Sequence, residues 1–452
     1  MTLLNELSAE VCQRARMSRD PRFDGRFFVA VKTTGIFCRP ICPANLPKEE
    51  NVEYFSSQAL AVSAGYRPCL RCRPESAPHS WAWKGAETTF LRALTLIEQG
   101  ELDGSLETLA SRLGISDRYL RQLFQRHLGM PPKQYAQIQQ LMFAKQLLHT
   151  SQISITEVAY ASGFQSTRRF NDAFQKLFRL TPTQVRRERA ALPSRNHLSL
   201  AFRGPFDWAH MLDFYRLRAI EGMELVDEQS YQRHFVLGEG TGWFKASMAQ
   251  SHVDIEFEME RLSDLRHLVA RLRRMFDLDA DLISIEAYLE QLAPGLVRRT
   301  GIRIPGVWNA WEAGVRAVLG QQVSVKAAIG QLNLLVSTLA ASEGSTRYFP
   351  TPEQVQMSDL SFLRMPERRK ETLKRLADYV RLHPMDSPMA WLSLSGIGPW
   401  TVDYAQLRGE SRSHCFLTGD LIVKKALAKF PQLTAESVAP WGSYATFHCW
   451  SH

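Results

Sequence analysis

Four of the seven cysteines lie in two close pairs near the start of the chain, and no other feature constrains the fold of its region as strongly. Cys38 and Cys42 are separated by three residues, Cys69 and Cys72 by two, and 26 residues lie between the pairs. Two pairs at such a separation are typical of a zinc ion held by four thiolates. The sequence therefore predicts one Zn(II) per chain. On spacing alone, a structural role in a segment with a small core is favoured.

The residues around these cysteines favour a chemical role as well. The stretches VAVKTTGIFCRPICPA and GYRPCLRCRPE resemble the N-terminal domain of Ada-type adaptive-response proteins, over roughly residues 10 to 76. The resemblance implies that all four cysteines bind zinc and that Cys38 also accepts a methyl group from a methylated DNA phosphotriester. A zinc-bound sulfur stays a thiolate at neutral pH and is therefore a ready nucleophile. Methylation would remove a negative charge from the site, which can switch the affinity for DNA.

An internal repeat follows the cysteine segment. Ala110 and Gly114 align with Ala159 and Gly163 at an offset of 49, and after one extra residue the offset becomes 50. A small residue followed four positions later by glycine suits two helices that cross tightly at a short turn. Two serines, Ser116 and Ser166, are good N-caps for the second helix of each unit. The repeat therefore predicts a duplicated helix-turn-helix.

The second helix of each unit is expected to enter the major groove of DNA. Leu120, Leu123, Phe124, Phe170 and Phe174 are the expected core residues of these two helices. The expected DNA-binding residues are polar or basic, of types that contact base edges and phosphates: Arg118, Arg121, Gln122, Arg168 and Arg169. The segment resembles the AraC-type DNA-binding domain, and a helical protein-binding module is the alternative. The side chains do not indicate which bases are read.

A glycine turn lies near the end of the chain. Gly396, Ile397 and Gly398 stand between two expected helical stretches, in WLSLSGIGPWTVDY. Glycines allow a close approach to a DNA backbone, and the N–H groups that open the next helix can bind a phosphate without reading sequence. Taken alone, the turn is weak evidence for DNA binding, and a helix C-cap is the favoured interpretation. Asp420 follows 20 residues after Trp400, and VRAVLGQQVSVKAA precedes the turn at residues 315 to 328.

This combination resembles the AlkA-type 3-methyladenine DNA glycosylases of the helix-hairpin-helix superfamily, over about residues 199 to 452. The resemblance implies that Asp420 is the catalytic aspartate, since a carboxylate facing C1′ stabilises an oxocarbenium-like transition state. On sequence alone, an N-cap of the helix that follows is the favoured role of Asp420, and that role is compatible with catalysis. A flipped base needs a pocket, and aromatic faces attract electron-poor alkylated purines. The family's aromatic pocket positions match Phe214, Trp400, Tyr404 and Trp450.

Several features refine the expected reaction. Trp400 occupies the hairpin position of the lysine with which related enzymes cleave the strand, so base removal without strand cleavage is expected. No four-cysteine loop follows the hairpin, so no iron–sulfur cluster is expected. Gln322, beside Gln321, matches the minor-groove wedge, which is commonly leucine in the family. Leu421 replaces a tyrosine often found after the aspartate, which would alter base selectivity.

The length of the chain and the distribution of its charge indicate how its domains are organised. The 452 residues suffice for about three domains. Residues 1 to 200 hold 27 basic and 17 acidic residues, a charge of +10, whereas the rest holds 28 and 29, a charge of −1. An uneven positive charge is typical of nucleic-acid binders. We expect a multidomain, mainly α-helical protein: a small α+β zinc domain (1–78), an all-α double helix-turn-helix (86–190) and a glycosylase (198–452). The glycosylase is expected to comprise an α+β part with a linker (198–305) and a helix-hairpin-helix part (306–452), and segments 76–87 and 190–201 are the expected linkers.

The combined interpretation is a DNA alkylation-response protein with a methyl acceptor, a regulatory DNA-binding module and a monofunctional glycosylase. Double-stranded DNA, both alkylated and promoter DNA, is the expected partner, with RNA polymerase as a second one. No membrane span or export signal is apparent, so a cytoplasmic, nucleoid-associated protein is expected. The alternative is a transcriptional regulator whose zinc is structural and whose glycosylase part only binds DNA.

Overall fold

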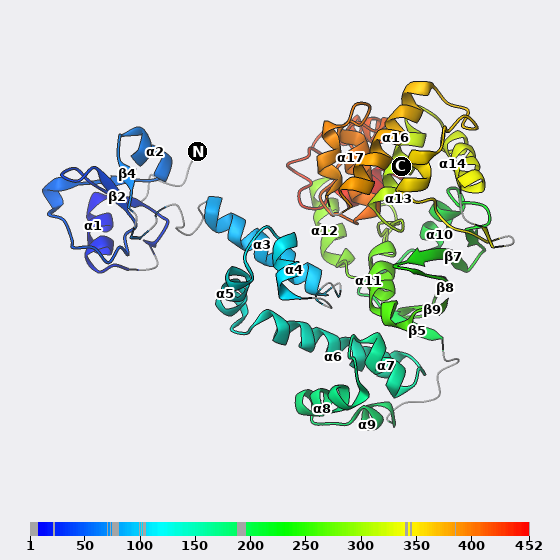
Figure 1. The fold of residues 1–452 in the computed structure, drawn as a ribbon. Helices are drawn as coiled ribbons and strands as arrows, with labels where there is room; N and C mark the ends of the chain where they lie inside the picture. Colours follow the sequence, from blue (N-terminus) through cyan, green and yellow to red (C-terminus); the bar gives the residue numbers. More distant parts are fainter. Residues whose placement is uncertain are drawn as a thin grey trace. The chain divides into compact units, whose positions relative to one another are not determined.

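The computed structural model describes residues 8–20, 23–69, 71–72, 74, 81–98, 100, 102, 105–187, 196–339, 342–343, 346–384 and 386–451. The chain divides into two compact units, residues 1–139 and 140–452. None of the described helices is long and apolar enough to cross a membrane. The fold is multidomain and mainly helical, as predicted (Figure 1).

The first unit begins with a small sheet between two helices. Its strands are β1 (Phe28–Val31), β2 (Ile36–Cys38), β3 (Val52–Phe55) and β4 (Arg67–Pro68), in the order β3-β1-β2-β4. Because successive side chains of a strand point to opposite faces, Val29 packs with residues of α1 (Ala9–Met17), whereas Phe28 and Ala30 pack with Ala61 of α2 (Gln58–Ser63). Strand β2 pairs antiparallel with β1 and parallel with β4. A short 3-10 helix, η2 (Glu49–Asn51), precedes β3.

The two helix-turn-helix motifs are built as predicted. The first consists of α3 (Trp81–Glu98), α4 (Leu106–Arg112) and α5 (Asp117–Leu128). The second consists of α7 (Ile155–Ala161), α8 (Thr167–Phe178) and α9 (Pro182–Arg187), and α6 (Pro132–Thr150) runs across the boundary between the two compact units. Ser116 and Ser166 cap α5 and α8 by accepting hydrogen bonds from Tyr119 N and Arg169 N. The five expected core residues of these helices are all buried, as predicted.

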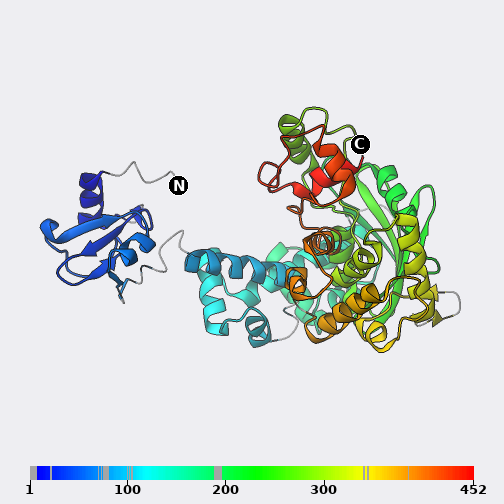
Figure 2. The ribbon, with the colours of Figure 1, turned by 90° about the horizontal axis from the view of Figure 1, so that it is seen from above.

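A five-stranded antiparallel sheet follows in the second unit, in the order β5-β9-β8-β7-β6. Figures 1 and 2 show this sheet, in green, beside the helices of the second unit. Its strands are β5 (His197–Ala201), β6 (Glu224–Val226), β7 (Ser230–Leu237), β8 (Gly240–Met248) and β9 (His252–Met259). One face is apolar, and it shares a core with α10 (Trp208–Arg216), α11 (Leu265–Met275) and the buried Trp308. The short helix η4 (Leu262–Asp264) leads into α11.

The rest of the second unit is helical, apart from the short strands β10 (Ser342–Glu343) and β11 (Thr346–Arg347). Its helices are α12 (Leu282–Leu292), α13 (Ala310–Gly320), α14 (Val325–Leu339), α15 (Pro352–Met357), α16 (Glu367–Leu382), η5 (Pro388–Ser393), α17 (Pro399–Gly409), α18 (Leu421–Leu427) and α19 (Gly442–Trp450). They form two cores, one around α13 and α16, the other around α12 and α19. Helix α17 contributes to both cores and therefore lies between them.

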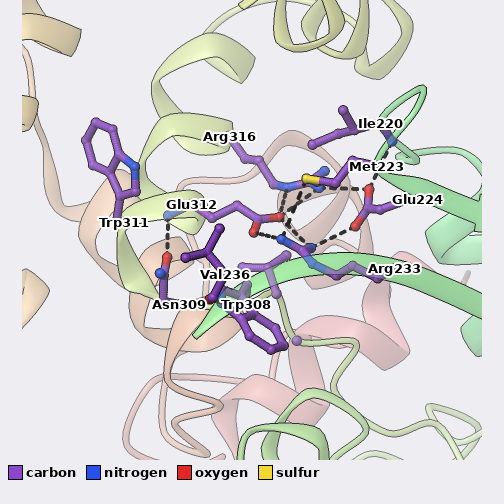
Figure 3. A network of polar contacts seen from close by, with 12 residues as sticks. Ile220, Met223, Glu224, Arg233, Val236, Trp308, Asn309, Trp311, Glu312 and Arg316 are labelled. Carbon is purple, nitrogen blue, oxygen red and sulfur yellow. Dashed lines mark hydrogen bonds and ion pairs between the residues drawn. The ribbon is translucent and has the colours of Figure 1, made fainter. Parts of the chain in front are cut away.

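A buried group of four charges joins the sheet to the helices (Figure 3). Arg233 of β7 pairs with Glu224 of β6 at 2.9 Å and with Glu312 of α13 at 2.5 Å. Arg316 of α13 pairs with the same two carboxylates, at 3.1 and 2.8 Å. Two positive and two negative charges cancel, so the group can be buried without a net charge. It fixes α13 against the sheet.

The structure differs from the expected organisation at the two linkers. Residues 81–87 and 197–201, assigned to linkers, belong to α3 and β5, while 75–80 and 188–195 lie outside the described residues. The small residues that suggested a linker are compatible with a helix. Helix α12 lies within the segment expected to hold the α+β part and its linker into helices (198–305), and its apolar residues Leu282, Ile285 and Leu289 pack with α18 and α19.

Candidate functional sites

The four paired cysteines meet in one cluster. Cys38 ends β2 and Cys69 follows β4, and the parallel pairing of these strands brings the two cysteine pairs together. The Cys69 amide donates to the carbonyl of Phe37, which neighbours Cys38. All four sulfur atoms lie within 4.8 Å of one another, a separation that fits four thiolate ligands around one zinc ion. Cys42 and Cys72 are buried, whereas Cys38 and Cys69 are partly exposed.

An ion pair that no local motif indicates supports this cluster. The guanidinium of Arg39 pairs with both carboxylate oxygens of Asp24, with Nε 2.8 Å from Oδ1. The backbone N–H of Arg39 donates to Cys72 Sγ at 3.3 Å. Such a hydrogen bond stabilises the thiolate form of a ligand. Asp24 lies 15 residues before Arg39, too far for a local motif to reveal the contact.

The expected DNA-reading side chains are exposed on their helices. Arg118, Arg121 and Gln122 are exposed on α5, and Arg168 and Arg169 are exposed on α8. One of them has an acidic neighbour, since Arg121 pairs with Asp117 at 3.0 Å. This exposure is compatible with the expected role, which stays a prediction.

A cavity of about 430 Å³ lies in the second unit. Side chains from α10, α13, α14, α17, α18 and α19 and their ends line it. The five residues assigned from the sequence to catalysis and base binding all line it: Asp420, Phe214, Trp400, Tyr404 and Trp450. The structure therefore brings together residues that are separated by more than 200 positions in the chain.

Asp420 is the N-cap of α18, the alternative that the sequence had left open. Its Oδ1 accepts hydrogen bonds from the amides of Ile422 and Val423, at 2.9 and 3.2 Å. The same oxygen accepts a third hydrogen bond, from the indole Nε1 of Trp450, at 3.1 Å. Among the described residues, no donor contacts Oδ2. The cap thus fixes the carboxylate in place and leaves one oxygen for another partner.

Aromatic rings form two stacked pairs in the cavity wall. Trp400 and Tyr404 stack with centroids 5.3 Å apart, and Phe214 and Trp450 stack at 6.2 Å. Phe447, which the sequence analysis did not select, also lines the cavity and contacts Phe214 edge to face. It lies three residues before Trp450, and this helical spacing was the available signal.

Two arginines also line the cavity, and the sequence analysis did not select them. Arg316 belongs to the buried group of four charges, whereas the guanidinium of Arg218 lies 3.7 Å from the centre of the Phe214 ring. Burial lowers the pKa of Arg218 to about 10. A third guanidinium, that of Arg408, donates from Nη1 to the hydroxyl of Tyr404 at 2.9 Å.

The glycine turn joins η5 to α17, as expected of a hairpin. Gly396 has a φ of 92°, and a Cβ there would lie 2.1 Å from Thr372 Oγ1, so only glycine fits. At Gly398, the N-cap of α17, a Cβ would have no neighbour within 4 Å. Ile397 was assigned to DNA binding, but its side chain is buried in the core around α13 and α16. Its backbone alone remains for that role, because an apolar side chain at this turn gains more by joining the core.

The two glutamines between α13 and α14 have different surroundings. Gln321 donates from Nε2 to the carbonyl of Gly396 at 3.1 Å and to Thr401 Oγ1 at 3.2 Å. It thereby ties this turn to the hairpin. Gln322 is exposed and has a φ of 56°, a strained value for a residue other than glycine. Its expected role as a wedge stays a prediction.

Family models match three parts of the chain: the metal binding domain of Ada at residues 11–75, a helix-turn-helix domain at 109–188 and the AlkA N-terminal domain at 197–309. These matches agree with the three resemblances found in the sequence.

One known relative matches nearly the whole chain, and others match one part of it. A Mycobacterium tuberculosis protein named probable bifunctional transcriptional activator/DNA repair enzyme AlkA is 35% identical, over 98% of this chain and 96% of its own. DNA-3-methyladenine glycosylase 2 of Escherichia coli is 33% identical, over 56% of this chain and 96% of its own. The bifunctional transcriptional activator/DNA repair enzyme Ada of the same species is 35% identical, over 38% of this chain and 47% of its own.

Proposed function

Because the chain belongs to the family of the bifunctional transcriptional activator/DNA repair enzyme AlkA, we propose that it hydrolyses the N-glycosidic bond of alkylated bases in double-stranded DNA. The cavity that holds Asp420 between aromatic rings is the observation that carries this proposal. The proposed substrates are bases of the 3-methyladenine type, and the proposed product is an abasic site in an unbroken strand.

Each cavity residue has a role in this proposal. The flipped base stacks against the rings of Trp400 and Tyr404. Phe214 and Trp450 face the base and its sugar from the other side. The C1′–N bond breaks with its electron pair passing to the base, and positive charge develops on the sugar. The Asp420 carboxylate stabilises that charge, and its free oxygen accepts a proton from the water that adds to C1′. The electron pair neutralises a cationic base of the 3-methyladenine type, so the proton passes from Asp420 to solvent.

The hairpin is proposed to hold the DNA near the cavity. Amides at the start of α17 face a phosphate, and Gly398 leaves the space for a close approach of the strand. Gln321 links the hairpin to the turn that carries Gln322, the proposed wedge. This arrangement contacts the backbone and gives no preference for a DNA sequence.

A second activity is proposed at the cysteine cluster. Cys38, Cys42, Cys69 and Cys72 would hold the zinc ion, which when bound keeps their sulfurs deprotonated. Cys38 Sγ attacks the methyl carbon of a DNA phosphotriester. The S–C bond forms as the C–O bond breaks, and the phosphodiester leaves with the electron pair. The thioether is stable, so each chain accepts one methyl group.

The helix-turn-helix pair is proposed to bind promoter DNA and to regulate transcription, with RNA polymerase as the partner of an activator. Its basic exposed side chains on α5 and α8 support this role. DNA as substrate and target places the proposed site of action in the cytoplasm, at the nucleoid.

One assay tests the glycosylase proposal against a regulator that only binds DNA. The full chain is incubated with methylated duplex DNA, free bases are identified by chromatography, and the strand is examined before and after alkaline cleavage of abasic sites. We expect free 3-methyladenine and strand breaks only after alkali. DNA binding without base release contradicts the glycosylase proposal and favours the regulator.

The methyl-acceptor proposal has its own test. The mass of the intact chain is measured after exposure to DNA that carries methyl phosphotriesters, and the modified peptide is sequenced. We expect a gain of one methyl group on Cys38, absent in Cys38→Ala and retained in Cys12→Ala, which alters a buried cysteine outside the cluster. No gain in the wild-type chain leaves the zinc site structural.

A further inference from the structure

The cavity has an electropositive side that a pocket for cationic bases does not need. Arg218 and Arg316 line it, and Arg408 contacts Tyr404 in its wall. Glu224 and Glu312 neutralise Arg316. Among the described residues, neither Arg218 nor Arg408 has a carboxylate partner. Arg218 contacts the carbonyl and ring of Phe214, and Arg408 contacts the carbonyl of Pro305, the Tyr404 hydroxyl and the Phe214 and Tyr404 rings.

Such uncompensated charges are costly to keep away from water. Arg408 is 1% exposed. Two such guanidinium groups beside a cavity, those of Arg218 and Arg408, add little to the stability of the fold. They are better explained by what the cavity binds, and they favour a group that becomes negative there.

The hydroxyl of Tyr404 is held so that its proton is available. It accepts a hydrogen bond from Arg408 Nη1 at 2.9 Å. Within the described part of the chain, the hydroxyl donates to no acceptor. Burial opposes ionisation of this phenol, but Arg408, Arg218 and Arg316 outweigh it and lower the pKa of Tyr404. A polarised O–H is a stronger hydrogen-bond donor than an ordinary phenol.

Damaged bases differ in the charge with which they leave. A cationic alkylated purine leaves as a neutral molecule, because the electron pair of the broken C1′–N bond cancels its charge. A neutral damaged base leaves with a negative charge on its ring. Donors aimed at that charge lower the barrier for the neutral base, whereas positive groups oppose the binding of a cation.

We propose that the Tyr404 hydroxyl, oriented by Arg408 and flanked by Arg218, donates a hydrogen bond to the leaving base and thereby promotes the release of neutral damaged bases. This inference rests on the proposed glycosylase activity. Asp420 stabilises the sugar cation on one side of the broken bond, and Tyr404 stabilises the base anion on the other. Water supplies the hydroxyl for C1′ and the proton that the base finally carries, so Tyr404 is not consumed.

The test compares two lesions in the same duplex: 7-methylguanine, which is cationic, and hypoxanthine, which is neutral. Single-turnover rates of base release are measured for the full-length wild-type chain and for Tyr404→Phe, which keeps the ring beside Trp400. We expect the ratio of the hypoxanthine rate to the 7-methylguanine rate to fall at least about tenfold. The control is Tyr288→Phe, which removes a hydroxyl bonded to the Ser437 carbonyl of the protein, and its ratio should equal that of the wild type.

A second variant checks the charge. In Arg218→Gln the same ratio should fall, because the cation that opposes 7-methylguanine and favours the hypoxanthine anion is lost. Equal losses on both lesions in Tyr404→Phe, or an unchanged ratio, overturn the inference. A wild-type chain that releases 7-methylguanine but no hypoxanthine also overturns it and leaves the glycosylase proposal intact. Release of neither lesion contradicts the glycosylase proposal itself.

Discussion

The indole Nε1 of Trp450 donates a hydrogen bond to Oδ1 of Asp420 at 3.1 Å, which joins the last helix of the chain to the cap of α18. The same indole ring stacks on Phe214, 6.2 Å away between centroids. One side chain therefore orients the proposed catalytic carboxylate and forms part of the proposed base pocket. The two contributions can be separated by substitution.

Trp450→Phe keeps an aromatic ring near Phe214 and removes the donor to Asp420. A hydrogen bond to a charged group contributes about 1.5–3 kcal/mol, so we expect base release to slow about tenfold to a hundredfold. The measurement is the single-turnover rate on methylated duplex DNA. Trp441→Phe, in a tryptophan that does not line the cavity, should keep the wild-type rate. A Trp450→Phe rate equal to the wild-type rate would show that the amides of α18 alone orient the carboxylate.

The two glycines of the hairpin should respond differently to alanine. Gly396→Ala places a Cβ against Thr372 in a left-handed backbone, so the thermal midpoint of unfolding should fall. Gly398→Ala has a permitted φ of −108° and open space, so its midpoint should be close to that of the wild type. Its affinity for duplex DNA should fall, because a methyl group now separates the hairpin from the strand. Unchanged affinity would contradict the proposed close approach.

Removing one partner from the buried group of four charges should lower the free energy of unfolding. In Glu312→Gln the charges of Arg233 and Arg316 lose a carboxylate that lies in contact with both. Breaking a buried ion pair typically costs about 3–5 kcal/mol, and the free energy of unfolding of this part of the chain should fall accordingly. Urea titration followed by tryptophan fluorescence measures it. Glu239→Gln removes one carboxylate of an exposed pair with Arg261, and it should cost less than about 1 kcal/mol.

Asp277 should make stability depend on pH. Burial raises its pKa to about 7, although the Ile304 amide and the Tyr444 hydroxyl donate to it. The folded chain therefore holds a proton that the unfolded chain releases near pH 4. Stability from this group is complete below about pH 4 and is lost as the pH rises to about 7. In Asp277→Asn the urea midpoint should lose this downward slope. The exposed neighbour Asp279, changed to Asn, should leave the slope in place.

Local patterns were sufficient to predict the chemical groups. Cysteine spacing identified the zinc ligands, and the two serine caps were read directly from the repeat. The resemblance located Asp420 and the four aromatic residues, which the fold then gathers around one cavity. The cysteine cluster and the serine caps could be predicted because each depends on residues within a short motif. The catalytic and base-binding roles of Asp420 and the aromatic residues stay predictions.

Contacts between distant segments could not be predicted in this way. Arg39 meets Asp24 across a turn, and Arg233 meets Glu312 from another element 79 residues away. The burial of Ile397 depends on a core that forms only when α13 and α16 are in place. Among the residues that the structure describes, Arg218 and Arg408 lack a carboxylate partner. This becomes visible only once their neighbours are known, because sequence does not reveal which charges are paired.

The most direct test of the whole account is the single-turnover rate of 3-methyladenine release by Asp420→Asn. Asparagine can still cap α18 and accept from Trp450, so the fold and DNA affinity should be retained. The matched control is Asp281→Asn, which alters the N-cap of α12 outside the cavity. We predict that Asp420→Asn binds methylated DNA as the wild type does but releases no base, while Asp281→Asn remains active. Base release by Asp420→Asn at the wild-type rate would contradict the account.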